Sequence, residues 1–303
     1  MKKRIIKKSS NGAVREWVNT LFWAGLIAII FRSFLLEPFN IPSASMLPNL
    51  HVGDHLFVTK WSYGYSRNSF PFGSWNLWNG RFAAFNEPSA GDVIVFRKPG
   101  GRIDYVKRLI GTPGDTVQMR AGRLYINDAR VVRENPRPYI IANLPRSLRT
   151  AGWQRVNNDG TITVIRGNNI FIDNERVDFN YTVQWVSDRL CVRNPWMCGV
   201  IDATEWTEVL PSGRQHQIIE ISDNEFFDNT QRFTVPENHF FMIGDNRDMS
   251  GDSRKESVGF VPRDNVVGPV WVIWYSHNYF APLVAVWTWY HKLRWDRFFI
   301  RVN

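Results

Sequence analysis

The sequence from Phe39 to Gly64 reads FNIPSASMLPNLHVGDHLFVTKWSYG. The prolines that flank its PSASMLP run fix their own φ angles and disfavour helix in the residues before them, so this run is stiff and non-helical. In an extended chain Ser43 and Ser45 point to the same side. They therefore offer a nucleophilic hydroxyl and a hydrogen-bond donor facing one substrate carbonyl. The alternative is an ordinary turn before a strand at residues 56–58, and this stretch alone favours the turn.

The composition of the chain points to a membrane partner. Its 303 residues are 44% hydrophobic and carry a net charge of +9, which fits contact with nucleic acid or with an anionic membrane. The sequence contains no zinc-finger spacing, no phosphate-binding glycine motif and no RNA-binding aromatic run. Basic residues cluster instead at the two ends of the chain: Lys2, Lys3, Arg4, Lys7 and Lys8, then Lys292, Arg294, Arg297 and Arg301. We therefore expect membrane lipids as partners and no nucleic acid.

A membrane anchor is predicted for residues 17–36, which read WVNTLFWAGLIAIIFRSFLL. About 20 apolar residues span a bilayer, and the basic residues 1–16 predict a cytoplasmic N-terminus with the rest of the chain exported. One alternative is a cleaved signal peptide, because Ser43-Ala44-Ser45 resembles a small-x-small cleavage site. That site lies well beyond the apolar run, behind bulky residues, so an uncleaved anchor is favoured. A buried core helix is the remaining alternative.

The rest of the chain has the pattern of a β protein. Short runs rich in Val, Ile and Phe alternate with Gly, Pro, Asn and Asp, and no long amphipathic helix separates them. We therefore expect a mainly β, mostly antiparallel fold, with a main domain of residues 37–126 and 238–303 and an inserted β subdomain of residues 127–237. The predicted strands are His55–Thr59, Asp92–Phe96, Tyr105–Ile110, Thr116–Arg120, Arg123–Ile126, Thr161–Val164, Asn169–Ile172, His216–Ile221, His239–Ile243 and Val267–Ile273.

Two features leave alternatives open. Cys191 and Cys198 are too isolated for a zinc site, so they form either a short-loop disulfide or two inert thiols, and an exported location favours the disulfide. The aromatic stretch from Tyr63 to Phe85 is either a loop that dips into the membrane interface or a surface loop packed on its own rings.

Two charged stretches add candidates for chemistry. Residues 104–115 read DYVKRLIGTPGD, and burial of Lys107 in this strand-like run would lower its pKa enough for it to act as a base. The alternative is a solvated lysine on an edge strand. Residues 242–254 read MIGDNRDMSGDSR, which lacks the spacing of a calcium loop and, read conservatively, is a salt-bridged turn. The sequence has no local histidine motif, although a Ser-His-Asp triad built from distant residues stays open. The residues suit Ser–Lys catalysis, with Ser250 orienting the lysine.

Four runs together resemble one enzyme family. PSASMLP, GDVIVF, DYVKRLIGTPGD and GDNRDMSGDSR occur in the order and spacing of bacterial type I signal peptidases, with the match extending from Glu37 to about Val270. The resemblance implies a membrane-anchored Ser–Lys endopeptidase without cofactor or metal that removes signal peptides from exported preproteins after Ala-x-Ala motifs. It implies a bacterial inner (plasma) membrane location, a catalytic domain on the periplasmic or outer side, and contact with the export machinery.

The resemblance also assigns roles to single residues. It implies Ser45 as nucleophile, Lys107 as general base, and Ser43 with the Ser45 backbone N–H as oxyanion donors. The implied lysine-orienting and supporting residues are Ser250, Asp252 and Arg254. The implied substrate-pocket residues are Phe39, Ile41, Leu50, Leu56, Tyr105 and Val106.

Two other classes of protein remain as alternatives. A repressor-type self-cleaving protease shares the Ser–Lys pair, but it needs a DNA-binding module where this chain has its apolar segment. A membrane-anchored, exported binding protein without catalytic activity would need none of Ser45, Lys107 and Ser250.

Overall fold

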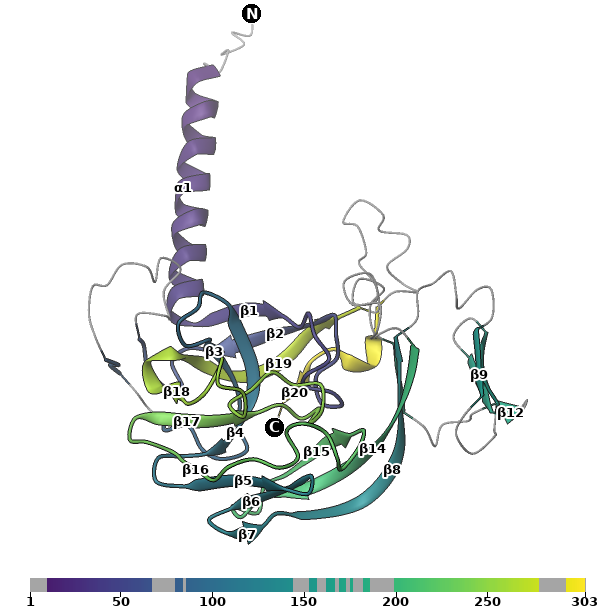
Figure 1. Ribbon diagram of the computed structural model, residues 1–303. Coiled ribbons are helices and arrows are strands. Elements are labelled where there is room, and N and C mark those ends of the chain that lie inside the picture. The colour runs from purple at the N-terminus through teal and green to yellow at the C-terminus, as the bar shows by residue number, and fades with distance from the viewer. Residues whose placement is uncertain are drawn as a thin grey trace, which may run out of the picture.

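The computed structural model describes residues 10–66, 80–83, 86–143, 153–156, 162–166, 169–172, 175–176, 182–185, 199–277 and 293–302. A single long helix, α1 (Ser10–Phe34), stands out from a body of β-sheets (Figure 1). Its segment Val14–Phe34 has a mean hydropathy of 1.4 and is only 6% buried, so by length and composition it is able to cross a membrane. This finding agrees with the predicted anchor, whereas the basic residues 1–9 lie outside the described residues.

Ion pairs join the end of α1 to the β body. The helix leads directly into strand β1 (Leu36–Asn40). There Glu37 accepts from Arg32 at 3.1 Å on the helix side and from the fully buried Lys60 at 2.8 Å on the body side. Because Lys60 is buried, its ion pair with Glu37 offsets part of the desolvation of the ammonium group. The two contacts fix the start of the β body at the foot of the helix.

The main sheet carries the candidate site. Its strands follow the order β1-β2-β19-β3-β4-β17-β18, with β20 paired to β19, and every pairing along this path is antiparallel. The bounds are β2 (Asp54–Thr59), β3 (Val93–Arg97), β4 (Asp104–Gly111), β17 (His239–Ile243), β18 (Val261–Pro262), β19 (Val266–Ser276) and β20 (Ile300–Arg301). Among the described residues, the short 3₁₀ helices η3 (Arg263–Asn265) and η5 (Trp295–Arg297) precede and follow β19 in the sequence.

Three smaller sheets complete the described fold. One has the order β16-β5-β6-β7, with β5 (Thr116–Arg120), β6 (Arg123–Ile126), β7 (Ala129–Arg130) and β16 (Phe233–Thr234). A second has the order β13-β8-β14-β15, with β8 (Val132–Asn143), β13 (Thr182–Trp185), β14 (Gly199–Val209) and β15 (Gln215–Glu220). The third has the order β12-β11-β10-β9, with β9 (Trp153–Val156), β10 (Ile162–Arg166), β11 (Asn169–Ile172) and β12 (Glu175–Arg176). Among the described strand pairings of these three sheets, only that of β13 with β8 is parallel.

Two apolar clusters hold the loop that carries Ser45. One lies beneath the main sheet and includes Met46 and Leu50 from the loop. The other packs Ala44 and Leu47 against side chains of β8 and β15, namely Tyr139, Ile141 and Ile219. Because neighbouring loop residues point into opposite clusters, the backbone around Ser45 is clamped from both sides. Segments far apart in the sequence therefore fix the position of this serine.

The predicted fold class, mainly β and mostly antiparallel with an N-terminal apolar helix, is confirmed, and every predicted strand overlaps an observed one. The sequence did not predict β1, β8 or β14. In β8 the polar run and its prolines conceal the strand, because Asn135 and Pro136 lie where the pairing with β14 shifts register. The division into a main domain and an inserted subdomain stays a prediction.

Two predictions concern residues outside this description. Cys191 and Cys198 lie outside the described residues, so the disulfide stays a prediction. Of the aromatic stretch from Tyr63 to Phe85, the structure describes residues 63–66 and 80–83 and most of the remainder is outside the description.

Candidate active site

Ser45 and Lys107 meet where the loop between β1 and β2 reaches strand β4 of the main sheet. Ser45 lies in the loop between β1 and β2 and is 8% exposed, and Lys107 lies in β4 and is 5% exposed. The Nζ atom of Lys107 donates to Ser45 Oγ at 2.6 Å and to the carbonyl oxygen of Val106 at 2.7 Å. A short contact of this kind sets a nucleophile and a base in proton-transfer geometry.

The surroundings of Lys107 favour its neutral form. The pKa of Lys107 is lowered from 10.5 to about 8, mainly by burial and to a smaller extent by the nearby guanidinium of Arg254, while the carboxylates of Asp252 and Asp245 oppose this shift. Burial has this effect because an ammonium loses its hydration in a protein interior. A substantial fraction of the lysine is then neutral near pH 8, as a general base requires.

Ser43 and a small cavity lie next to this pair. The Oγ atoms of Ser43 and Ser45 are 3.3 Å apart. The cavity has a volume of about 80 Å³, and both serines line it together with four predicted pocket residues: Phe39, Ile41, Tyr105 and Val106. The cavity is small and largely apolar, so it fits a small side chain such as that of alanine.

The other two predicted pocket residues lie elsewhere. Leu50 and Leu56 are fully buried in the apolar cluster beneath the sheet and do not line the cavity. They pack against Ile41 and Met46, which do line it. Their position supports the wall of the cavity from behind, so they affect its shape without facing a ligand.

Asp252 and Arg254 form a buried ion pair behind Lys107. Arg254 Nε and Nη2 donate to the two oxygens of Asp252, each at 2.9 Å, and the backbone N–H of Gly244 donates to Asp252 at 3.1 Å. Burial raises the pKa of Asp252, but the charge of Arg254 and these hydrogen bonds outweigh it, and the pKa is lower than its ordinary value. The carboxylate is therefore charged and raises the pKa of Lys107 without contacting Ser45.

Ser250 is close to the pair but is not bonded to Lys107. Its Oγ atom is buried and has no partner in hydrogen-bond geometry among the described residues. It is near enough to Asp252 to contribute weakly to the low pKa of that carboxyl group. The structure therefore places Ser250 beside the supporting ion pair, and its predicted contact with the lysine is absent from the described residues.

Sequence reasoning missed three residues that hold the site together. Asn246 fixes the serine loop, because its backbone N–H donates to Ser45 O at 3.2 Å and its Nδ2 donates to Ala44 O at 3.1 Å. Arg108 and Asp245 form a two-point ion pair with distances of 2.8 Å. The polar run after an apolar strand was a visible signal, but its partners across the fold were not readable from the sequence.

The C-terminal segment closes against the same loop. Arg297 Nη2 donates to Asn49 O at 2.9 Å and also pairs with the buried Asp54 at 2.7 Å. Arg294 pairs with the same carboxylate at 3.0 Å. Arg294 and Arg297 belong to the basic cluster for which membrane contact was predicted. They also bind the C-terminal segment to the loop that carries Ser45.

A family profile and relatives similar in sequence name one family. The profile of the family described as "Signal peptidase, peptidase S26" matches residues 14–275. Signal peptidase I of Rickettsia typhi (strain ATCC VR-144 / Wilmington) is 32% identical over 275 residues, which cover 88% of this chain and 82% of the relative. Signal peptidase I of Rickettsia prowazekii (strain Madrid E) is 31% identical over 276 residues, which cover 88% of this chain and 83% of that relative. A crystal structure of a signal peptidase I from Enterococcus faecalis V583 is similar with a TM-score of 0.28 and 23% identity, covering 61% of this chain and 98% of that chain.

The chain is therefore a peptidase with a mainly antiparallel β body and an N-terminal apolar helix. It belongs to the signal peptidase family, peptidase S26.

Proposed function

We propose that this protein is a membrane-anchored endopeptidase that removes N-terminal signal peptides from exported preproteins, with Ser45 as nucleophile and Lys107 as general base. The observation that carries the proposal is the 2.6 Å contact between Lys107 Nζ and Ser45 Oγ, made where both side chains are buried. The names of the Rickettsia relatives, signal peptidase I, support the same reaction and substrate class.

The first half of the reaction forms an acyl-enzyme. Neutral Lys107 accepts the proton of Ser45 as Oγ attacks the scissile carbonyl carbon. The Ser43 hydroxyl and the Ser45 backbone N–H donate hydrogen bonds to the developing oxyanion, and the Oγ–Oγ distance of 3.3 Å supports this role for Ser43. The Lys107 ammonium then protonates the leaving amine, which departs as the new N-terminus of the mature protein.

The second half releases the signal peptide. Lys107, neutral again, accepts a proton from water as the water oxygen attacks the ester carbonyl. The tetrahedral intermediate collapses, the proton returns from Lys107 to Ser45 Oγ, and the signal peptide leaves with a free carboxylate. Both halves use the same base, so a single lysine carries each proton.

The cavity supports cleavage after small-x-small (Ala-x-Ala) motifs. Its volume of about 80 Å³ admits a small side chain next to Ser45 and is too small for a large aromatic one. Phe39 and Tyr105 bound it with rigid rings, and rigid walls discriminate by size better than flexible ones. We expect preproteins with bulky residues at these positions to be poor substrates.

The direct test is cleavage of a preprotein by the purified full-length chain in detergent. The wild type should produce the mature protein with an N-terminus directly after a small-x-small motif, and Ser45→Ala should produce none. Ser212→Ala, in the exposed turn between β14 and β15, is a matched control that should remain active. If the protein bound the preprotein without cleaving it, it would be a binding protein. If it cleaved only its own chain, it would be a self-cleaving protease. Either result would overturn the proposal.

The membrane orientation follows from α1 and the basic start of the chain. We propose a single-pass protein of the bacterial inner (plasma) membrane with a cytoplasmic N-terminus, in contact with lipids and the export machinery, and with residues after about Glu37 on the outer side. The apolar, exposed segment Val14–Phe34 supports this arrangement. Protease added outside intact spheroplasts should digest the β body, and full protection of that body would contradict the orientation.

A further inference from the structure

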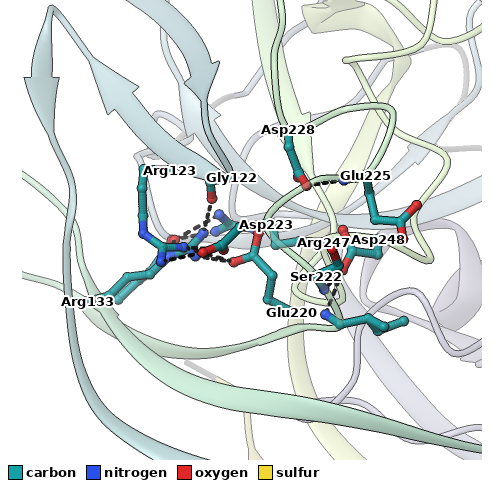
Figure 2. Close-up of polar contacts among 12 residues, drawn as sticks. Gly122, Arg123, Arg133, Glu220, Ser222, Asp223, Glu225, Asp228, Arg247 and Asp248 are labelled. Carbon is teal, nitrogen blue, oxygen red and sulfur yellow. Dashed lines mark hydrogen bonds and ion pairs between the residues drawn. The ribbon is translucent and has the colours of Figure 1, made fainter. Parts of the chain in front are cut away.

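Three carboxylates from separate segments converge on one side of the loop that carries Ser250. Glu220 ends β15, Asp228 lies in the turns that follow, and Asp248 lies in the loop after β17 (Figure 2). One carboxylate oxygen from each lies within 4.8 Å of the others. Glu220 is 4% exposed and Asp228 is 0% exposed, so this cluster is an interior one rather than a solvated acidic face.

The surrounding arginines do not balance the cluster. Glu220 itself pairs with Arg133, and three neighbouring acids have a guanidinium partner as well: Glu208 with Arg247, Asp223 with Arg123, and Asp252 with Arg254. Within the described part of the chain, Asp228 and Asp248 have no ion pair. Two carboxylates, one buried and one partly buried, therefore lack an ion-pair contact, and their combined charge when ionised matches that of one divalent cation.

Two oxygens in the cluster also lack hydrogen bonds. Glu220 Oε1 and Asp228 Oδ1 are buried and have no partner among the described residues. Backbone N–H groups occupy other oxygens: Glu225 N–H donates to Asp228 Oδ2, and Ile221 N–H donates to Asp248 Oδ2 at 2.6 Å. A buried carboxylate oxygen without a donor is costly, so these two oxygens point to a ligand that binds anionic oxygen.

The mutual repulsion of the acids agrees with this view. The pKa of Glu220 is raised to about 7, mainly by burial and also by the charges of Asp248 and Asp228, while the charges of Arg133 and Arg247 oppose this shift. Burial likewise raises the pKa of Asp228. The site as it stands therefore disfavours its own negative charge, which a bound cation would stabilise.

We propose that Glu220, Asp228 and Asp248 bind one divalent cation of the calcium type. The ligand set is all oxygen, which hard cations prefer. Two calcium ligands on opposite sides of the ion are separated by about 4.6–5.2 Å, twice a bond of 2.3–2.6 Å, whereas magnesium limits the same separation to about 4.2 Å. Each pair of these oxygens is no more than 4.8 Å apart, which is within the span of one calcium ion.

The sequence predicted no metal because residues 242–254 lack calcium-loop spacing. The proposed ligands instead come from three places in the chain, and only Asp248 belongs to that run. A bound cation would link residues 220–228 to the loop that carries Ser250 and Asp252. Its role is to stiffen the support behind Lys107 rather than to take part in the reaction.

Equilibrium dialysis of the metal-stripped, full-length protein against ⁴⁵Ca²⁺ tests the proposal. We expect one saturable calcium ion per chain, with a Kd on the order of 0.1–1 mM as in exported calcium modules. Saturating calcium should raise Tm by about 2–6 °C relative to sodium chloride of equal ionic strength. Magnesium should bind at least about tenfold more weakly because it demands near-ideal octahedral geometry and gives up its water ligands reluctantly.

Variants locate the binding site. Asp228→Asn and Asp248→Asn should each weaken calcium binding at least about tenfold, whereas Asp223→Asn, a neighbouring half-exposed acid paired with Arg123, should not. Calcium binding that persists in both variants would place the ion elsewhere and overturn the proposal. Absence of saturable binding to the wild type would also overturn it, whether or not the variants fold. In that case a proton would occupy the cluster, and Asp228→Asn would raise Tm in metal-free buffer.

Discussion

Arg108 and Asp245 form a buried ion pair in which Nε and Nη2 each lie 2.8 Å from a carboxylate oxygen. The arginine directly follows Lys107, and the aspartate directly precedes Asn246, which holds the backbone of Ser45. The pair thus connects the strand of the proposed base to the loop that fixes the proposed nucleophile. Breaking it should affect stability more than an exposed pair would, and it should also affect the site.

Asp245→Asn should lower the free energy of unfolding by about 3–5 kcal/mol, because it leaves the buried charge of Arg108 without its partner. Urea denaturation of the detergent-solubilised protein, followed by tryptophan fluorescence, measures this change. Asp128→Asn is the matched control, since that carboxylate pairs with Arg120 and Arg232 at the surface and should contribute less than about 1 kcal/mol. Equal losses for the two variants would contradict a special role for the buried pair.

Lys107→Arg should be as inactive as Lys107→Ala, although it preserves the positive charge. A guanidinium stays protonated at every accessible pH and cannot accept the serine proton. Initial rates of preprotein cleavage check this, with Lys98→Arg, which lies just after β3, as an active control. If Lys107 were only a structural cation, arginine would replace it well and alanine poorly, so a Lys107→Arg enzyme near the wild-type rate would exclude the Ser–Lys mechanism.

The pH dependence of kcat/KM should report the titration of Lys107. The base works only when neutral, so kcat/KM should rise with pH below about 8 and level off above it. Asp245→Asn removes a charge that raises this pKa and should move the rise to lower pH. Because the pKa of Lys107 is lower in the folded protein than in the unfolded chain, the unfolded lysine binds its proton more tightly. The contribution of Lys107 to the free energy of unfolding should therefore decrease as the pH drops from 10.5 to 8. A kcat/KM that is constant from pH 6 to 9 would rule out this lysine as the base.

Ser43→Ala should reduce kcat by roughly 10²–10³-fold with little change in KM, as the loss of one oxyanion donor does elsewhere. The Ser43 hydroxyl lies 3.3 Å from Ser45 Oγ and lines the same cavity, so its removal leaves the Ser45–Lys107 contact intact. Steady-state kinetics with a signal-peptide substrate separate the two constants. An unchanged kcat would show that Ser43 does not face the substrate carbonyl.

Gly244→Ala should impair cleavage at least tenfold and lower stability by about 1–3 kcal/mol, the usual cost of inserting an atom into a packed site. A Cβ atom at this position would lie 2.2 Å from Ser250 Oγ and 2.5 Å from the carbonyl oxygen of Ser45. Gly251→Ala is the matched control, because its Cβ would meet nothing within 4 Å. Similar activities for the two variants would mean that the serine loop tolerates displacement.

Local patterns in the sequence determined the parts of this protein that depend on neighbouring residues. The apolar run at residues 17–36 predicts α1 because length and hydropathy alone decide whether a helix can span a bilayer. Short runs rich in Val, Ile and Phe between turn residues predicted ten of the twenty described strands, because strand preference is also a property of neighbouring residues. Four sequence runs were enough to propose Ser45 and Lys107 as partners, because their order and spacing resemble those of one family.

Only the tertiary structure decided what depends on distant segments. Leu50 and Leu56 looked like pocket residues, but the packing of the sheet buries them behind the cavity. The meeting of Glu220, Asp228 and Asp248 also has no local signature. The lowered pKa of Lys107 arises from burial under a loop that lies 62 residues away in the sequence. Burial and the distances between charges depend on how the whole chain packs, whereas a sequence pattern carries only the preferences of adjacent residues.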